Sequence, residues 1–224
     1  MPPRALLFAI DDCLVDWSDA IQAAVANALA VLNLSSEPLA ARSLGEEITS
    51  YTWRMREGRV VERAHWRLFF EPGEPIDRAF PGYPPSMRRE AARMFHAALK
   101  PALFADVLPS LSALSSRPLG VLSNSSLARV TLRRLGVLDR FAVVAIAEDP
   151  HRKPHKDAFA RACGVLGLPP GDVAFVGSSL ANDVEGAINA GHAPVFWIDR
   201  FSERRPVPRG ATRIRSLSDL PALL

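Results

Sequence analysis

Cysteine is scarce in this chain, and long apolar runs and a large excess of one charge are absent. Its two cysteines, Cys13 and Cys163, are too few for a disulfide framework, so we expect a cytoplasmic protein. No apolar stretch reaches the roughly 18–20 residues of a membrane span, and the run at 5–10 ends at Asp11 and Asp12, short of a signal-peptide core. The net charge of +3 is too small to argue for nucleic acid, so neither a nucleic acid nor a membrane is an expected partner.

The overall composition is that of a globular protein. Of the 224 residues, 48% are hydrophobic and 23% are charged, which excludes a disordered or fibrous chain. The length suits one substantial domain, or a core domain that carries a smaller inserted module.

Short apolar runs recur along the chain and are continuous rather than alternating. They lie at 5–10, 119–122, 143–147, 173–176 and 195–198. Such runs are typical of strands buried on both faces of a parallel sheet. Helical patterns lie between them at 125–136, 158–166 and 184–191. The alternation predicts an α/β fold with a doubly wound, Rossmann-like parallel sheet.

Residues 17 to about 100 interrupt this alternation, because no convincing strand pattern occurs there. Asp16 can cap a helix with an apolar stripe at 21–32, and a second amphipathic stripe covers 87–99, beyond a proline- and glycine-rich stretch. We therefore expect a helical module at 17–100, inserted in a core domain made of 1–16 and 101–224. After the last apolar run, the polar stretch 204–210 leads into a short docking segment at 217–224.

In doubly wound sheets, ligands bind at the carboxyl ends of the strands. Four segments follow the apolar runs, and together they resemble the haloacid dehalogenase (HAD) superfamily, in particular its phosphoglycolate phosphatase-like members with a helical cap. The family motif Asp-x-Asp-Gly-Thr-Leu-Val-Asp is matched by 9–16, and the three later motifs by Ser123-Asn124, Lys153-Pro154 and 177–183. The resemblance covers nearly the whole chain and implies a HAD-like core with an inserted all-helical cap.

The resemblance also implies that the catalytic site is degenerate. In the family the first Asp attacks phosphorus and the second acts as general acid and base. The Leu-Val-Asp match places Ala9 at the nucleophile position and Asp11 at the acid/base position. Ser178 stands where the family has a Mg²⁺-binding Asp, so only Asp183 and the Asp11 backbone carbonyl remain as metal ligands. Mg²⁺ binding is thus weakly supported, and we predict impaired phosphatase activity.

The rest of the motif set predicts residual binding of a small phosphorylated metabolite or another small anion. Ser123 and Asn124 stand at a strand-to-helix turn, where free N–H groups favour phosphate, and Lys153 supplies a positive charge. Three alternatives remain open. They are an active phosphomonoester hydrolase that uses Asp11, a dehalogenase-like hydrolase with the serine pair at 178–179, and a structural or partner-binding pseudoenzyme.

Other residues favour plainer interpretations. His151 and His155 are four apart, but the intervening Pro154 and the lack of an evident third ligand disfavour a metal site. Cys13 is expected to serve packing rather than catalysis. A group of arginines near two tryptophans is read as a solvated face of the inserted module rather than as an anion site; it comprises Arg54, Arg56, Arg59, Arg63 and Arg67 beside Trp53 and Trp66.

Overall fold

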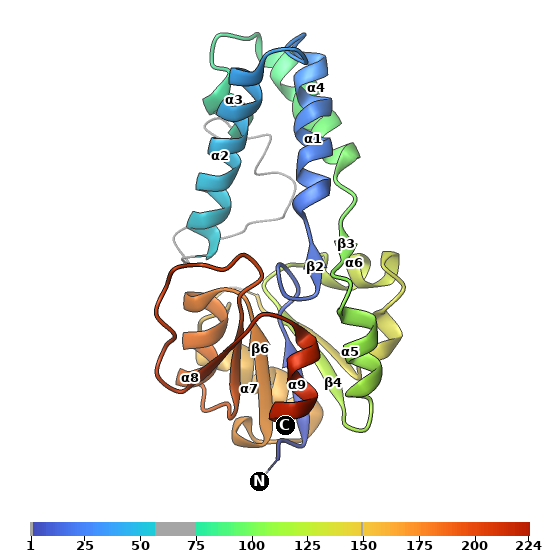
Figure 1. Cartoon of the computed structure of the whole chain (residues 1–224), viewed down its shortest axis with the longest axis vertical. Coiled ribbons are helices and arrows are strands. Elements are labelled where there is room, and N and C mark those ends of the chain that lie inside the picture. The colour runs from blue at the N-terminus through green and yellow to red at the C-terminus, as the bar shows by residue number, and fades with distance from the viewer. Residues whose placement is uncertain (1, 57–74, 149) are drawn as a thin grey trace. The chain divides into compact units, whose positions relative to one another are not determined.

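The computed structural model describes residues 2–56, 75–148 and 150–224, which fall into two compact units (Figure 1). The core unit comprises Met1–Val15 and Leu103–Leu224, and the helical unit comprises Asp16–Ala102. Both ends of the chain belong to the core unit. The arginine and tryptophan group of the inserted module lies in a stretch whose side chains are outside the described residues.

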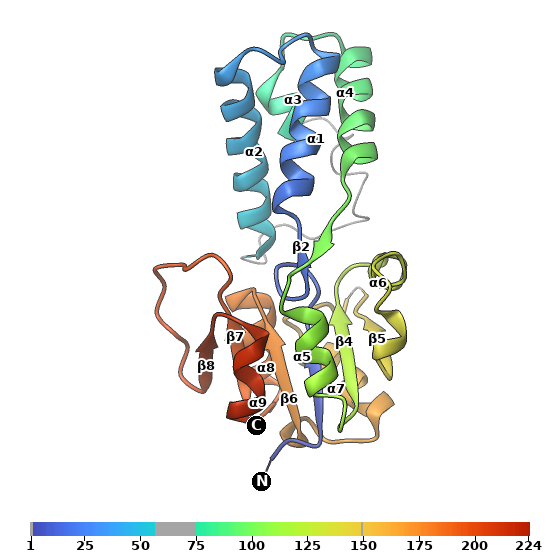
Figure 2. The same cartoon turned by 45° about the vertical axis from the view of Figure 1, so that its right-hand side comes forward.

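The core unit is built on a six-stranded sheet, seen from a second side in Figure 2. Its strands follow the order β5-β4-β1-β6-β7-β8, and every neighbouring pair is parallel. The strands are β1 (Ala5–Phe8), β4 (Leu119–Ser123), β5 (Val143–Ile146), β6 (Val173–Gly177), β7 (Val195–Ile198) and β8 (Ala211–Ile214). The five predicted strands and the parallel α/β sheet are confirmed.

The edge strand β8 was not predicted. Its exposed and half-buried residues precede a single buried one, Ile214, so it carries no continuous apolar run. The polar stretch at 204–210 therefore leads first into this strand and not directly into the docking segment. That segment follows as the 3₁₀ turn Leu217–Asp219 and α9 (Leu220–Leu223), and both Leu217 and Leu220 are fully buried.

Helices cover the sheet because its strands are apolar on both faces. The core helices are α5 (Val107–Ala113), α6 (Ala128–Arg134), α7 (Lys156–Leu166) and α8 (Gly186–Asn189), and a π-helical turn, Leu180–Glu185, runs directly into α8. Residues of α7, this turn and α8 share one buried cluster with Ala5 and Leu7 of β1. Since side chains alternate along a strand, Leu6 and Phe8, also fully buried, face the other layer. Short 3₁₀ turns at Leu138–Arg140 and Pro170–Asp172 lead into β5 and β6.

The helical unit contains α1 (Ser18–Val31), α2 (Pro38–Arg56), α3 (Pro75–Ala79) and α4 (Pro85–Ala98). Alanine, leucine and phenylalanine side chains from these helices form a core of their own, which includes Ala24, Leu44 and Phe95. Asp16, expected to cap α1, precedes the N-cap residue, which is Trp17. Its carboxylate still accepts a hydrogen bond from the N–H of Ser18, the first residue of the helix, at 2.8 Å.

The two connections between the units are short strands. β2 (Val15–Asp16) leads out of the core unit and β3 (Ala102–Leu103) leads back, and the two form a two-stranded sheet. Within the described residues, no helix has both the length and the apolar character that crossing a bilayer requires.

Candidate functional site

The carboxyl ends of β1, β4 and β6 lie side by side in the sheet, and the predicted site residues follow them. The chain after β1 supplies Ala9 and Asp11, and β4 ends at Ser123. Ser178 follows β6, and Lys153 comes from the loop between β5 and α7. Parallel strands end at one edge, so residues far apart in sequence gather there.

A buried ion pair occupies the middle of this site. Lys153 Nζ lies 2.6 Å from Asp183 Oδ1, and the two side chains are only 7% and 5% exposed. Lys153 Nζ also donates to the Leu122 carbonyl at 3.0 Å. The other carboxylate oxygen of Asp183 accepts the N–H groups of Ser178 and Ser179 at 3.1 and 3.0 Å. The charge of Lys153 is therefore balanced within the protein.

Gly177 is required by the position of this carboxylate. A Cβ atom built at residue 177 would lie 2.7 Å from Cγ of Asp183, closer than real Cβ contacts come. The last residue of β6 must therefore lack a side chain for the Asp183 carboxylate to reach the backbone N–H groups after the strand.

Asn124 fixes the backbone of Lys153 from the neighbouring strand end. Its Oδ1 accepts the Lys153 N–H at 2.8 Å, and its Nδ2 donates to the Lys153 carbonyl at 3.1 Å. The Arg152 guanidinium donates to the Asn124 carbonyl at 2.9 Å. Ser123 has a more local role, since its Oγ accepts the Ser125 N–H at 3.0 Å. The structure therefore joins Asn124, Lys153 and Asp183 directly, whereas Ser123 stabilises its own turn.

Ala9 and Asp11 follow β1 in different environments. Ala9 is 2% exposed and its N–H donates to the Val176 carbonyl at 2.8 Å, which continues the ladder beyond β1. Asp11 is exposed, and its carbonyl accepts a hydrogen bond from Ser178 Oγ at 2.8 Å. Asp12, between Asp11 and Cys13, has a left-handed backbone conformation with φ of 56°. The Ala9 methyl offers no nucleophile, acid or metal ligand.

Among the described residues, those at this site do not fit a Mg²⁺ ion. Magnesium requires hard oxygen ligands in near-octahedral geometry, usually including one or two carboxylates. The Asp183 carboxylate already binds an ammonium and two N–H groups. The Asp11 carbonyl accepts the Ser178 hydroxyl, so a neutral donor faces the oxygen that would bind the cation.

The two cysteines are buried, and neither is a reactive thiolate. Burial raises the pKa of the Cys13 thiol far above its usual range. Burial also raises the pKa of Cys163 to about 11. His192 lies beside Cys163, with Nε2 3.7 Å from Sγ, and burial lowers the pKa of this imidazole despite its hydrogen bond with the Val173 carbonyl. A neutral histidine beside a protonated thiol does not form a catalytic dyad at neutral pH.

The histidine pair has a third potential ligand that sequence reasoning missed. Asp157 Oδ2 lies 3.1 Å from His151 Nδ1 and 3.7 Å from His155 Nδ1. The interpretation that no third ligand accompanies the pair is therefore wrong. In the sequence, the only indication of this third ligand was that Asp157 lies two residues after His155, close to the start of a predicted helix.

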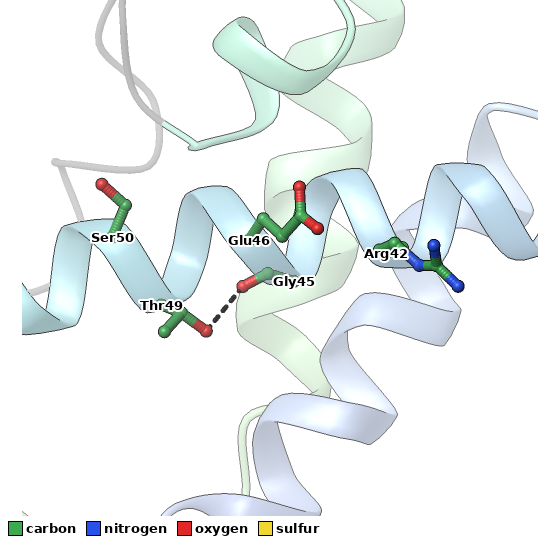
Figure 3. Close-up of a pocket in the computed structure, with 5 residues that line it drawn as sticks. All are labelled: Arg42, Gly45, Glu46, Thr49 and Ser50. Atoms are coloured by element: carbon green, nitrogen blue, oxygen red, sulfur yellow. Dashed lines mark hydrogen bonds between the residues drawn. The ribbon is translucent and has the colours of Figure 1, made fainter.

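A separate hollow of about 560 Å³ lies on the helical unit (Figure 3). One helix, α2, supplies all five lining residues drawn: Arg42, Gly45, Glu46, Thr49 and Ser50. The Thr49 hydroxyl donates to the Gly45 carbonyl at 2.8 Å, within the helix itself. This hollow contains none of the residues singled out from the sequence.

The structure defines an α/β protein with a parallel sheet, polar side chains gathered at the carboxyl ends of its strands, and a helical unit inserted after its first strand. A family model described as haloacid dehalogenase-like hydrolase matches residues 3–191. The chain belongs to this family, which confirms the resemblance of its motifs.

Individual relatives agree with this membership. Mouse N-acylneuraminate-9-phosphatase is 37% identical over 86 residues, a match that covers 37% of this chain and 34% of the relative. The chain thus matches about a third of the length of that curated relative. Among solved structures, a 2-haloacid dehalogenase from Pseudomonas syringae is 26% identical, with a TM-score of 0.64 and coverage of 100% and 98% of the two chains. YfnB from Bacillus subtilis, bound to magnesium, has a TM-score of 0.74 at 19% identity, with coverage of 100% and 99%.

Proposed function

We propose that this chain is a catalytically impaired HAD-like hydrolase that binds a small phosphorylated metabolite, or another small anion, with little or no turnover. The observation that carries the proposal is the methyl group of Ala9 at the position where the family has its nucleophile. Loss of the nucleophile from a catalytic unit costs on the order of 10⁴ to 10⁶ in turnover. In this proposal the helical unit acts as the cap that selects the ligand.

The backbone at Asp12 supports the register behind this proposal. The family motif has glycine after its second Asp, and Asp12, the residue aligned with that glycine, has a φ of 56°. Left-handed backbone is where glycine is favoured and where Asp is tolerated. If Asp11 were the nucleophile instead, the glycine of the motif would align with Leu14, which is not among the residues with positive φ in the described chain.

Ligand binding in this proposal depends on Lys153. Its ammonium lies at the strand ends, where it binds Asp183. An anion therefore has to compete with the Asp183 carboxylate for Lys153 Nζ, and it gains hydrogen bonds from the turn after β4 where Ser123 and Asn124 lie. Asp11, exposed in the chain after β1, is proposed to be the remaining acid/base group.

The ligand class comes from the relatives. A phosphatase that acts on a phosphorylated sugar acid is among the proteins similar to this chain, so a sugar phosphate is the ligand class to test first. Mg²⁺ has no role in this proposal. The neutral Ser178 hydroxyl replaces a charged ligand, and it donates a hydrogen bond to the Asp11 carbonyl, the oxygen that would otherwise bind the ion.

The experiment compares hydrolysis of p-nitrophenyl phosphate by the chain and by Ala9→Asp and Asp11→Asn, with and without Mg²⁺. Ala142→Asp, which adds the same charge at an exposed residue, is the matched control. We expect no turnover by the chain or the control. Mg²⁺-dependent turnover by the unmodified chain that disappears in Asp11→Asn would overturn the proposal in favour of an active hydrolase.

Calorimetry with N-acylneuraminate 9-phosphate and inorganic phosphate tests the binding part. We expect binding by the chain and at least ~10-fold weaker binding by Lys153→Met, which removes the cation. If the chain binds neither compound at millimolar concentration, the ligand-binding role fails and a structural or partner-binding pseudoenzyme is favoured.

A further inference from the structure

Three potential metal-ligating side chains converge at the start of α7, in the core unit. His151 lies in the turn before the helix, His155 is its N-cap residue and Asp157 is in its first turn. Within the part of the chain that the structure describes, this is the one group of three or more His, Cys, Asp or Glu side chains close enough to share an ion. The group takes no part in the proposed phosphate site.

The distances between the donor atoms match those around a tetrahedral metal. The Nδ1 atoms of His151 and His155 lie 3.4 Å apart. Asp157 Oδ2 lies 3.1 and 3.7 Å from these two nitrogens. Tetrahedral zinc with metal–ligand bonds of about 2.0–2.1 Å separates its ligand atoms by about 3.3–3.4 Å. Each measured distance lies within a few tenths of an ångström of that separation.

We propose that His151, His155 and Asp157 bind one divalent transition-metal ion, with Zn²⁺ the best match. Two imidazole nitrogens and a carboxylate oxygen form a ligand set that suits zinc and its neighbours better than Mg²⁺ or Ca²⁺. The side chains are 30%, 46% and 41% exposed, so solvent reaches the group and water completes the coordination.

Without the ion, the contacts in the group are weak enough to be replaced. The Asp157 N–H donates to His155 Nδ1 at 3.3 Å, long for such a bond, and this is the hydrogen bond that the metal would displace. The two imidazole nitrogens face each other at a distance near the limit for a hydrogen bond. A cation between them satisfies both lone pairs and places the Asp157 carboxylate against a positive charge.

The site also has a consequence for the loop that carries Lys153. Its ligands stand on both sides of Lys153 and Pro154, so a bound ion closes a bridge across this segment. Asn124 already fixes the backbone of Lys153 through two hydrogen bonds. The ion adds a second constraint on the same loop.

The test is titration of the chelator-stripped full chain with Zn²⁺, followed by calorimetry. We expect one site per chain and a loss of affinity of at least ~10-fold in His151→Ala and in Asp157→Asn, because losing even an outer-shell partner of a metal ligand costs roughly 10–100-fold. Asp19→Asn is the control, since Asp19 is an exposed acid in the first turn of α1. It should bind Zn²⁺ as the unmodified chain does.

A spectroscopic measurement tests the geometry independently. Co²⁺ in place of Zn²⁺ should give the intense visible absorption of a tetrahedral site, and His155→Ala should abolish it. The buried cysteines do not compete, because burial raises the pKa of both thiols. Zn²⁺ binding that is absent, or equally strong in the three ligand variants, would overturn the proposal. Neither readout uses a phosphate ligand, so this result is independent of the proposed function.

Discussion

The buried pair Lys153–Asp183 should contribute asymmetrically to stability. Asp183→Asn leaves the ammonium of Lys153 buried without a counter-charge, with only neutral oxygens as acceptors, and breaking a buried ion pair in this way costs roughly 3–5 kcal/mol. Lys153→Met leaves the Asp183 carboxylate with two N–H donors, from Ser178 and Ser179. We therefore expect a smaller cost of about 1–3 kcal/mol for that variant.

The double variant Lys153→Met/Asp183→Asn measures the interaction energy between the two side chains, apart from the contacts that each makes with other residues. Because no unpaired charge remains, its destabilisation should fall short of the sum of the two single variants by about 1–3 kcal/mol. Urea unfolding followed by circular dichroism measures each free energy, with unchanged slopes as the check on two-state behaviour. Glu90→Gln breaks an exposed pair with Arg93 and should leave the midpoint unchanged. Additive single effects, or a costlier Lys153→Met, would refute the reasoning.

Three further predictions concern the core unit. Gly177→Ala should cost about 1–3 kcal/mol in thermal unfolding, because its methyl collides with Asp183. Burial lowers the pKa of His192, so its stabilising contribution should decline as pH falls below 6.5, and His192→Gln should flatten the dependence of melting temperature on pH. Burial alone would raise the pKa of Asp106, but hydrogen bonds from Arg200 and two other donors hold it below 3.8. Its contribution is thus present above that pH and is lost in acid; Asp106→Asn should cost about 1–3 kcal/mol in urea at neutral pH and less at pH 3.

Most of the fold could be predicted because strands buried on both faces produce continuous apolar runs. β1, β6 and β7 have such runs and were found from them. β8 lies at the sheet edge and has exposed residues, so hydrophobicity carries little signal there. The strand is defined by its hydrogen bonds with β7, and a sequence does not display those.

The candidate site could be predicted only in part, because its partners depend on three-dimensional contacts. The motifs brought Lys153 and Asp183 to the same sheet edge, but the sequence does not show that the ammonium binds this carboxylate. The spacing of His151 and His155 was visible, and Pro154 correctly excluded a continuous helix through both. Asp157 lies beside both because the chain before α7 bends so that His151 meets the first turn of the helix, and the sequence does not display that bend.

The pairing of β2 with β3 has a consequence for how this protein can vary. Because the chain leaves and re-enters the core unit through neighbouring strands, the two ends of the helical insertion lie next to each other. The unit between those ends has a hydrophobic core of its own, and even a flexible loop costs only about 0.6 kcal/mol more to close for each doubling of its length. The inserted helices can therefore be lengthened, exchanged or redesigned while the six-stranded sheet keeps its order, which makes this pair of strands a natural junction for building chimeras.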